Sequence, residues 1–221
     1  MAVTTTNVHQ YKGKNIMVVY DSKRCIHAKE CVHGAPAVFN PAAKPWVSPD
    51  NAEAKAIAAV IRRCPTGALH YVAEDSRLAE HADPSNTIKT VPDGPLYVRG
   101  NLNLVTESGE VLLSDTRIAL CRCGASRNKP FCDNSHFAVP FVEPATASPG
   151  ESAGSEMATS GKLNLVPTAD GPLHLQGQIT IRNAADEVIF EGIETWLCRC
   201  GGSANKPYCD GTHERIGFKS T

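Results

Sequence analysis

Apolar residues in the first third of the chain follow two different periods. Residues 15–20, NIMVVY, form a short apolar run typical of a buried strand, and residues 68–72, ALHYV, form a second one. Between them, residues 52–63, AEAKAIAAVIRR, carry apolar side chains at helical spacing. The pattern predicts a small N-terminal domain that combines a helix with strands.

From residue 93 onward, apolar and polar positions alternate, which predicts half-buried strands. Residues 107–110, ESGE, and residues 183–187, NAADE, each interrupt the alternation with turn-forming side chains, so each predicts a hairpin. The alternating pairs are Leu96/Val98, Leu102/Leu104, Val111/Leu113, Ile179/Ile181 and Val188/Phe190.

These strands belong to an internal repeat. Residues 93–136 align without a gap with residues 170–213, at a constant offset of 77, and 19 of the 44 positions are identical. A repeat of this kind indicates a duplication, so any function should involve two equivalent sites. Each copy has only about 45 residues, a size at which a hydrophobic core alone is marginal. We therefore expect the copies to pack against each other and to need a metal to fold.

Two polar segments separate these regions. Residues 73–92 end in a turn that contains proline, and residues 140–162 are rich in Pro, Ala, Ser and Gly, so both suit flexible linkers. The expected organisation is an N-terminal domain (1–72), a linker (73–92), a first module (93–139), a flexible linker (140–162) and a second module (163–221).

Composition narrows the function classes. The 221 residues carry 22 Lys and Arg against 23 Asp and Glu, a balance that argues against a nucleic-acid binder. No apolar run reaches the roughly 18 residues of a membrane span, and the first residues lack the apolar core of a secretory signal. We therefore expect a cytoplasmic protein with no membrane partner.

Nine cysteines are unusual for such a chain, and they fall into three groups of three. An odd number in a reducing compartment does not favour a disulfide framework, so metal ligation is the better interpretation. Each module ends in C-x-C-x8-C-x3-H. The candidate ligands are Cys121, Cys123, Cys132 and His136 in the first module, and Cys198, Cys200, Cys209 and His213 in the second.

Three thiolates and one imidazole can bind either zinc or an iron–sulfur cluster. Structural zinc sites usually use cysteine pairs with two to four intervening residues. A C-x-C pair can instead hold one iron of a two-iron cluster, which leaves the third cysteine and the histidine for the other iron. Zinc in an interaction module stays as an alternative.

The full strings, CRCGASRNKPFCDNSH and CRCGGSANKPYCDGTH, resemble the CDGSH iron–sulfur (NEET) family over roughly 93–139 and 170–218. The resemblance implies one [2Fe–2S] cluster per module on three Cys and one His, in a protein that is usually an intertwined dimer. This chain would then carry both halves as an intramolecular pseudo-dimer. Asn134 stands where the family has glycine, and Asn tolerates a positive φ angle next best.

A single histidine ligand has chemical consequences. The resemblance implies a potential between about −400 mV for plant-type clusters and the range of about −150 to +300 mV for clusters with two histidines. Because imidazole can be protonated, such a cluster should be labile in acid, which would allow its transfer. Flanking residues could assist as cations (Arg122, Arg199, Lys129, Lys206), donors to sulfur (Ser126, Ser203) and helix N-caps (Asp133, Asp210). For Arg122 and Arg199, base rates favour solvated surface charges.

The third cysteine group lies in the N-terminal domain. Cys25 and Cys31 occur in DSKRCIHAKECVHGAPAVF, and Cys64 opens CPTGAL. This arrangement, over about residues 14–73, resembles the divergent mono-cluster bacterial ferredoxins, whose first run is normally C-x2-C-x2-C. Here Ala28 occupies the middle position. The resemblance implies a [3Fe–4S] cluster on three cysteines, or a [4Fe–4S] cluster with His27, His33 or a non-protein ligand at the fourth iron.

Together these observations predict an α+β protein: a small ferredoxin-like α+β domain followed by two β-rich CDGSH modules. It would carry three clusters and transfer single electrons between redox partners such as a reductase. The alternative is a cluster donor to an apo iron–sulfur acceptor, or a redox or iron sensor. No nucleophile–base constellation is visible, so we expect no enzymatic activity. We expect a monomer or a weak oligomer.

Overall fold

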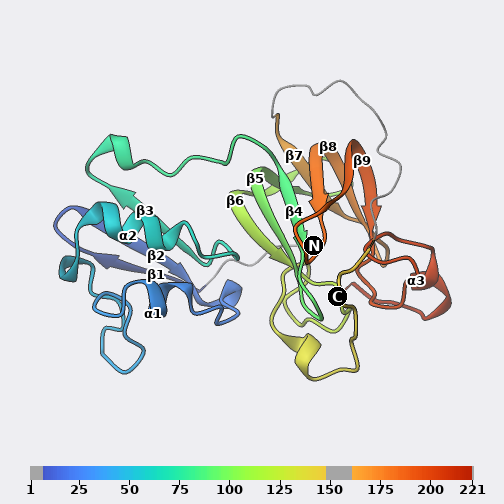
Figure 1. Ribbon diagram of the computed structural model, residues 1–221, viewed down its shortest axis with the longest axis horizontal. Coiled ribbons are helices and arrows are strands. Elements are labelled where there is room, and N and C mark those ends of the chain that lie inside the picture. The colour runs from blue at the N-terminus through green and yellow to red at the C-terminus, as the bar shows by residue number, and fades with distance from the viewer. Residues whose placement is uncertain (1–6, 148–160, 221) are drawn as a thin grey trace. The chain divides into compact units, whose positions relative to one another are not determined.

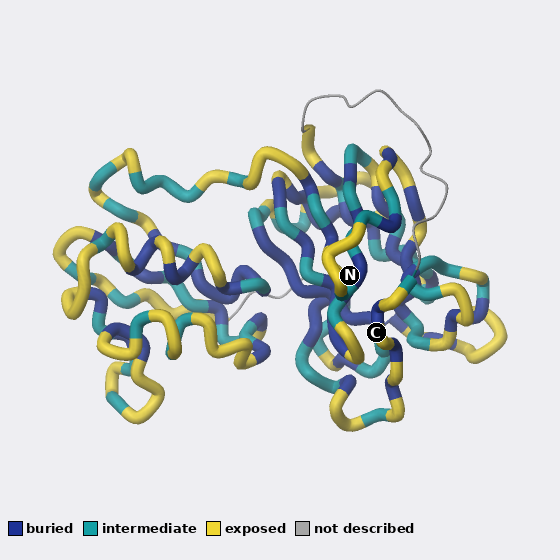
Figure 2. The backbone as a smooth tube through the Cα atoms, in the orientation of Figure 1, coloured by how far each residue is buried: buried dark blue, intermediate teal, exposed yellow. Residues whose placement is uncertain are grey.

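The computed structural model describes residues 7–147 and 161–220. The chain forms two compact units, which meet in the sequence between His81 and Ala82 (Figure 1). In each unit buried residues occur at alternating positions of the strands, whereas residues 8–12 and many connecting loops are largely exposed (Figure 2). Residues 148–160 of the expected 140–162 linker lie outside the described residues.

The N-terminal unit is built on a three-stranded antiparallel sheet in the order β1-β2-β3. Helix α2 packs Ile57 and Ile61 into the core beside this sheet, as its apolar spacing predicts. The elements are β1 (Val8–Lys12), β2 (Ile16–Asp21), α1 (Glu30–Gly34), α2 (Ala54–Ile61) and β3 (Leu69–Ala73), with single 3-10 turns at Ser22–Arg24, Pro49–Asn51 and Ser76–Leu78.

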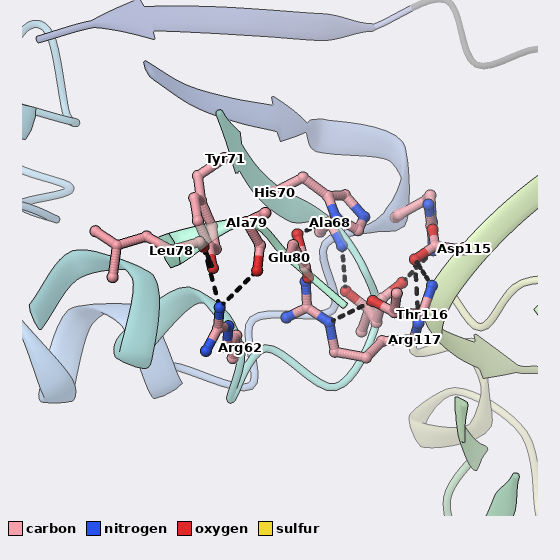
Figure 3. Close-up of polar contacts among 12 residues, drawn as sticks. Arg62, Ala68, His70, Tyr71, Leu78, Ala79, Glu80, Asp115, Thr116 and Arg117 are labelled. Atoms are coloured by element: carbon pink, nitrogen blue, oxygen red, sulfur yellow. Dashed lines mark hydrogen bonds and ion pairs between the residues drawn. The ribbon is translucent and has the colours of Figure 1, made fainter. Parts of the chain in front are cut away.

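The segment that follows β3 is bound to this unit (Figure 3). Arg62 donates to the carbonyl oxygens of Leu78, at 3.1 Å, and Ala79, at 2.9 Å. The Tyr71 hydroxyl donates to the same Leu78 carbonyl at 2.6 Å. These bonds fix the beginning of the segment 73–92 that the sequence assigns to a linker.

The C-terminal unit contains the two copies of the repeat in one six-stranded sheet. Each copy contributes three strands in equivalent positions. They are β4 (Thr87–Thr90), β5 (Leu96–Val105) and β6 (Val111–Leu120) in the first copy, and β7 (Leu163–Pro167), β8 (Leu173–Arg182) and β9 (Val188–Leu197) in the second. Strand β4 therefore lies inside the segment 73–92.

The first strand of each copy pairs with strands of both copies, which closes a ring of four strands. β4 pairs antiparallel with β5 of its own copy and parallel with β8 of the other. β7 likewise pairs antiparallel with β8 and parallel with β5. Apolar residues from both copies fill one core, in which Ile88 lies opposite Ile181 and Leu104 opposite Leu165. Neither copy has a core of its own, as the size of the repeat predicts.

A glycine at equivalent positions of the two copies lies at a close backbone approach within each copy. Gly100 and Gly177 lie at bulges in β5 and β8, with φ of 134° and 127°. A β carbon at Gly177 would lie 2.5 Å from the Lys162 carbonyl oxygen, and one at Gly100 would lie 2.8 Å from the Asn86 α carbon. The identical glycine therefore marks where the residue before the first strand of each copy approaches the bent second strand of the same copy.

The expected α+β class, with a ferredoxin-like α+β domain at the N-terminus, is wrong, because strands dominate the described residues. The α-helices there have only five, eight and four residues; the third is α3 (Thr212–Arg215). The duplication explains the difference, since each copy adds three strands and no more than one helical turn beside its histidine. The first copy forms a 3-10 turn (Ser135–Phe137) in the place of α3.

Across the described ranges, no helix combines the length and apolar character needed to cross a membrane.

Candidate metal centres

Each cysteine–histidine motif folds back onto the end of the strand that precedes it. Cys121 follows β6 and donates its backbone N–H to the Pro130 carbonyl at 2.9 Å, while Cys132 donates to Ala119 at 2.9 Å. The second copy repeats both bonds from Cys198 to Pro207 and from Cys209 to Trp196. The loop is thus held on its own strand, with its ligands on one side.

The four ligands of each copy are arranged as two close pairs. In the first copy, the Sγ atoms of Cys121 and Cys123 are 3.7 Å apart, and Cys132 Sγ lies 3.6 Å from His136 Nδ1. The equivalent distances in the second copy are 3.6 and 3.4 Å. Two ligands on one tetrahedral ion lie about 3.8 Å apart for two sulfurs and about 3.6 Å apart for sulfur and nitrogen. Each pair therefore has the spacing of two ligands on one metal ion.

The pairs do not combine into a single four-ligand site. Within the described ranges, no three His, Cys, Asp or Glu side chains converge on one point where an ion could bind. Each copy therefore has two pairs of protein ligands, one pair for each of two metal ions. That donor set fits a two-iron cluster, in which sulfide completes the coordination of both irons.

An aspartate fixes the turn that carries each histidine. The Asp133 carboxylate accepts backbone N–H bonds from Ser135, at 3.0 Å, and from Arg127, at 2.8 Å. Burial opposes the ionisation of Asp133, but these bonds keep its pKa below the ordinary value. Asp210 makes the same two bonds in the second copy, at 3.0 and 2.8 Å.

The expected N-cap lies one residue further on. The N-cap is Asn134 in the first copy, with φ of 71°, and Gly211 in the second, with φ of 80°. Asp133 and Asp210 precede it and close an Asx-type turn. The prediction that Asn134 can replace glycine at a positive φ angle is confirmed.

The serines and lysines of the motif bind the backbone, contrary to expectation for the serines. Ser126 Oγ donates to the Phe131 carbonyl at 2.7 Å, and Lys129 Nζ donates to the Ser126 carbonyl at 2.8 Å. Ser203 and Lys206 repeat these contacts at 2.7 and 2.6 Å. These side chains stabilise the loop. Backbone N–H groups are the donors to sulfur, as from Asn134 to Cys132 Sγ at 3.4 Å.

The two arginines are buried, so their assignment as solvated surface charges is wrong. Arg122 is 3% exposed and Arg199 5%. Each donates its Nε–H to a backbone carbonyl of its own copy, Gly94 at 2.8 Å and Gly171 at 2.9 Å. Arginine side chains are usually exposed in proteins, which misled the prediction. The conformation of the loop, rather than the residue type, determines this burial.

The two motifs meet at their C-x-C segments. Cys123 and Cys200 form an isolated antiparallel bridge between the copies. Gly124, with φ of 78°, lies so close that a β carbon there would be 2.6 Å from the Cys200 carbonyl oxygen. Gly201 approaches the Cys123 carbonyl in the same way, at 2.7 Å. The two candidate centres are therefore neighbours.

Without metal, burial favours the protonated forms of several of these thiols. Burial raises the pKa of Cys132 to about 11 and that of Cys200 to about 11. The hydrogen bond between Cys121 and Cys123, together with burial, raises the pKa of Cys121, whereas the same bond lowers that of Cys123. Metal binding must therefore displace protons, which makes it stronger as pH rises.

The two centres differ in exposure. His136 and Cys132 are buried, whereas His213 and Cys209 are partly exposed. Burial lowers the pKa of His136, which keeps the imidazole in the neutral form that binds metal.

The three N-terminal cysteines line one cavity of about 510 Å³. Cys25 follows the 3-10 turn after β2, Cys31 lies in α1, and Cys64 comes directly after α2. Burial, and then the neighbouring Cys64, raise the pKa of Cys31 to about 11. Ala28 also lines the cavity, so the position where a fourth cysteine would be expected faces the same space.

The structure distinguishes the two histidines proposed as a fourth ligand. His27 lines the cavity and has a φ of 56°, but His33 is not among the lining residues. The sequence reasoning missed the aromatic wall of this cavity, formed by Tyr11, Tyr20 and Trp46. Burial, and then the nearby Cys25, raise the pKa of Tyr20. Tyr20 lies only five residues before Cys25 in the sequence, and this proximity could have identified it as a neighbour of the site.

The model of the "Iron-binding zinc finger CDGSH type" family matches residues 93–137 and 170–214, and that of the "Divergent 4Fe-4S mono-cluster" family matches residues 11–74. The chain therefore carries two tandem CDGSH-type iron-binding domains and a divergent 4Fe–4S mono-cluster domain. It is thus an iron–sulfur protein. The resemblances drawn from the sequence are confirmed.

Two curated proteins are similar to part of this CDGSH-type chain. They are the "Uncharacterized protein YjdI" of Escherichia coli (strain K12) and the protein of the same name from Escherichia coli O157:H7. Each is 39% identical over 61 residues, which span 28% of this chain and 80% of the relative. No solved structure matches the chain.

Proposed function

We propose that the protein holds three iron–sulfur clusters and transfers single electrons between redox partners. The observation that carries the proposal is the division of each CDGSH ligand set into two pairs, with 3.7 and 3.6 Å within the pairs of the first copy. This division favours a [2Fe–2S] cluster in each module over one tetrahedral zinc ion. The adjacent C-x-C loops would bring the two clusters close enough to exchange electrons.

The third cluster would bind Cys25, Cys31 and Cys64 in the N-terminal cavity. We favour a [3Fe–4S] cluster because Ala28 faces the cavity without a ligand atom. The alternative is a [4Fe–4S] cluster, with His27 or a non-protein ligand at the fourth iron. A bound cluster would supply reversible one-electron chemistry. The protein would set its potential through burial, the backbone N–H groups and the aromatic wall.

The proposed role is that of a carrier, with no substrate reaction of its own. Its partners would be a reductase and a second redox protein. A carrier needs stable ligands and a path between clusters, and the buried ligands of the first CDGSH site suit this role.

The second candidate function is cluster donation or redox and iron sensing. The partial exposure of His213 and Cys209 favours this alternative at the second site. Protonation of His213 would compete with its metal bond, so the second cluster could leave more readily than the first.

The proposal is tested on anaerobically purified protein by three measurements. Iron and acid-labile sulfide should be present at two of each per CDGSH module, with zinc absent. Low-temperature EPR of the oxidised protein should show a spin-half signal near one spin per chain if the third cluster is [3Fe–4S]. An EPR-silent, iron-loaded protein would establish the [4Fe–4S] alternative. A colourless protein with zinc and no sulfide would overturn the proposal.

Replacement of each histidine by cysteine separates the two functions. His136→Cys and His213→Cys should shift the potential of a carrier and leave its reduction by partners intact. In a donor, the same variants should abolish transfer to an apo acceptor while retaining the colour.

A further inference from the structure

The two CDGSH centres differ in charge at one pair of equivalent positions. Glu143 and Ser220 are separated by the repeat offset of 77. Their backbone N–H groups make the same bond, to Asp93 at 2.6 Å and to Asp170 at 2.8 Å. The equivalence therefore holds in the structure, and only the side chain changes.

Around Arg122, Glu143 supplies a counter-charge. The Glu143 carboxylate forms an ion pair with the Arg122 guanidinium, and both side chains are at least nine-tenths buried. The other Glu143 oxygen accepts the Ala145 N–H at 2.9 Å. Phe141 covers the guanidinium at 5.6 Å from its ring centre. The buried cation is thus neutralised.

Around Arg199, no such partner exists among the described residues. Phe218 covers the guanidinium in the same way, at 5.6 Å. Ser220 is occupied with Asp170, donating its hydroxyl to the carboxylate at 3.1 Å. The Nη1 atom of Arg199 is buried and has no hydrogen-bond partner.

The remaining charges near Arg199 do not replace the missing carboxylate. Asp170 faces Arg199 but pairs with Lys219 at 2.7 Å, whereas its equivalent Asp93 faces Arg122 without an equivalent lysine. Glu107 is exposed, where water screens its charge, and its carboxylate accepts the Ala169 N–H at 3.0 Å. Arg199 is therefore the less compensated of the two buried cations.

Each arginine interacts with a cysteine of the other copy as well as with a ligand of its own copy, Arg199 with Cys200 and Arg122 with His136. Among the cysteines, Arg199 interacts most strongly with Cys121, and Arg122 interacts with Cys198. The antiparallel contact of Cys123 with Cys200 explains this crossing, because it brings each C-R-C segment against its counterpart. The uncompensated cation thus interacts more strongly with the first centre, through Cys121, than with the second, through Cys200.

We propose that Glu143 makes the two CDGSH clusters unequal in potential, so that an electron occupies the cluster of Cys121, Cys123, Cys132 and His136 first. The inference rests on the proposed two-cluster function. Reduction adds a negative charge to a cluster, and a buried uncompensated cation favours that state. The charges are shielded from solvent, so salt screens their effect little. Glu143 acts on the second centre through its ion pair with Arg122 and is therefore a positioning residue, not a ligand.

The test is a potentiometric titration of the holoprotein followed by EPR. His136→Cys changes the spectrum of the first site alone and so assigns the signals. In the native protein, the equilibrium constants for reducing the two sites should differ at least tenfold, which corresponds to about 59 mV for one electron. Glu143→Gln should raise the potential of the second site and close most of the gap.

Glu143→Ser combined with Ser220→Glu should reverse the order of reduction. This second variant keeps the test valid if Glu143→Gln alone does not fold. Glu191→Gln is the matched control, because it removes an exposed carboxylate from β9 and should leave both potentials unchanged. Coincident native potentials, or equal shifts of both sites in Glu143→Gln, would overturn the inference. If the native protein contained no iron or acid-labile sulfide, this would instead refute the proposed function.

Discussion

Gly124 lies against Cys200 so closely that a β carbon on Gly124 would come within 2.6 Å of the Cys200 carbonyl oxygen. The contact joins the metal-binding loops of the two copies. We predict that Gly124→Ala separates the loops and destabilises the C-terminal unit. A positive φ angle costs alanine about 1–2 kcal/mol, and the clash with the backbone adds to this cost.

Gly109→Ala is the matched control for this prediction. Gly109 has a φ of 87°, but nothing lies within 4 Å of its added β carbon. It therefore measures the cost of the φ angle alone. Chemical denaturation of both variants should show the larger loss in Gly124→Ala, and equal losses would contradict a close contact between the loops.

Ala28→Cys should complete the ligand set of the N-terminal site. Ala28 lines the same cavity as Cys25, Cys31 and Cys64, so a thiolate there can reach the fourth iron position. If the native cluster is [3Fe–4S], the variant should lose the spin-half EPR signal of the oxidised protein and gain iron. Ala28→Ser tests whether a larger side chain at this position has the effect without a thiolate. Retention of the EPR signal in Ala28→Cys would refute the idea that the missing fourth ligand lies at this position.

Acid should release the second CDGSH cluster before the first. His213 is partly exposed, whereas His136 is 8% exposed and burial lowers its pKa, so solvent reaches the imidazole of His213 more easily. Visible absorbance after a drop to pH 5 should therefore decay in a fast and a slow phase. His213→Cys should abolish the fast phase, and His136→Cys the slow one. The opposite assignment would disprove the role of exposure.

Asp170 should stabilise the protein above pH 4 and lose this effect in strong acid. Its hydrogen bond from Lys219, and then that from the Ser220 N–H, lower its pKa from 3.8 to about 2. Because the folded pKa is the lower one, the stabilisation is complete above the unfolded value and disappears as pH falls through about 2. Urea titrations between pH 5 and about pH 1 should show Asp170→Asn less stable at pH 5 and approaching the native protein below pH 2. A difference that persists undiminished below pH 2 would rule out this ionisation as the cause.

The sequence by itself determined the local structure and the candidate ligands. Its periodicity located β2, α2 and β3, and its turn residues located the hairpins between β5 and β6 and between β8 and β9. The offset of 77 residues identified the equivalent motifs. Spacing alone could do this because strands, turns and C-x-C loops depend on neighbouring residues.

Only the tertiary structure decided the long-range features. Three features depend on segments far apart in the sequence: the pairing of β4 and β7 with strands of the other copy, the burial of Arg122 and Arg199, and the Glu143 ion pair. The fold class was mispredicted because periodicity locates helices and strands but does not predict what share of the residues each type contains. Residue types report average exposure, whereas the closed ring and the paired loops determine which charges are shielded from water.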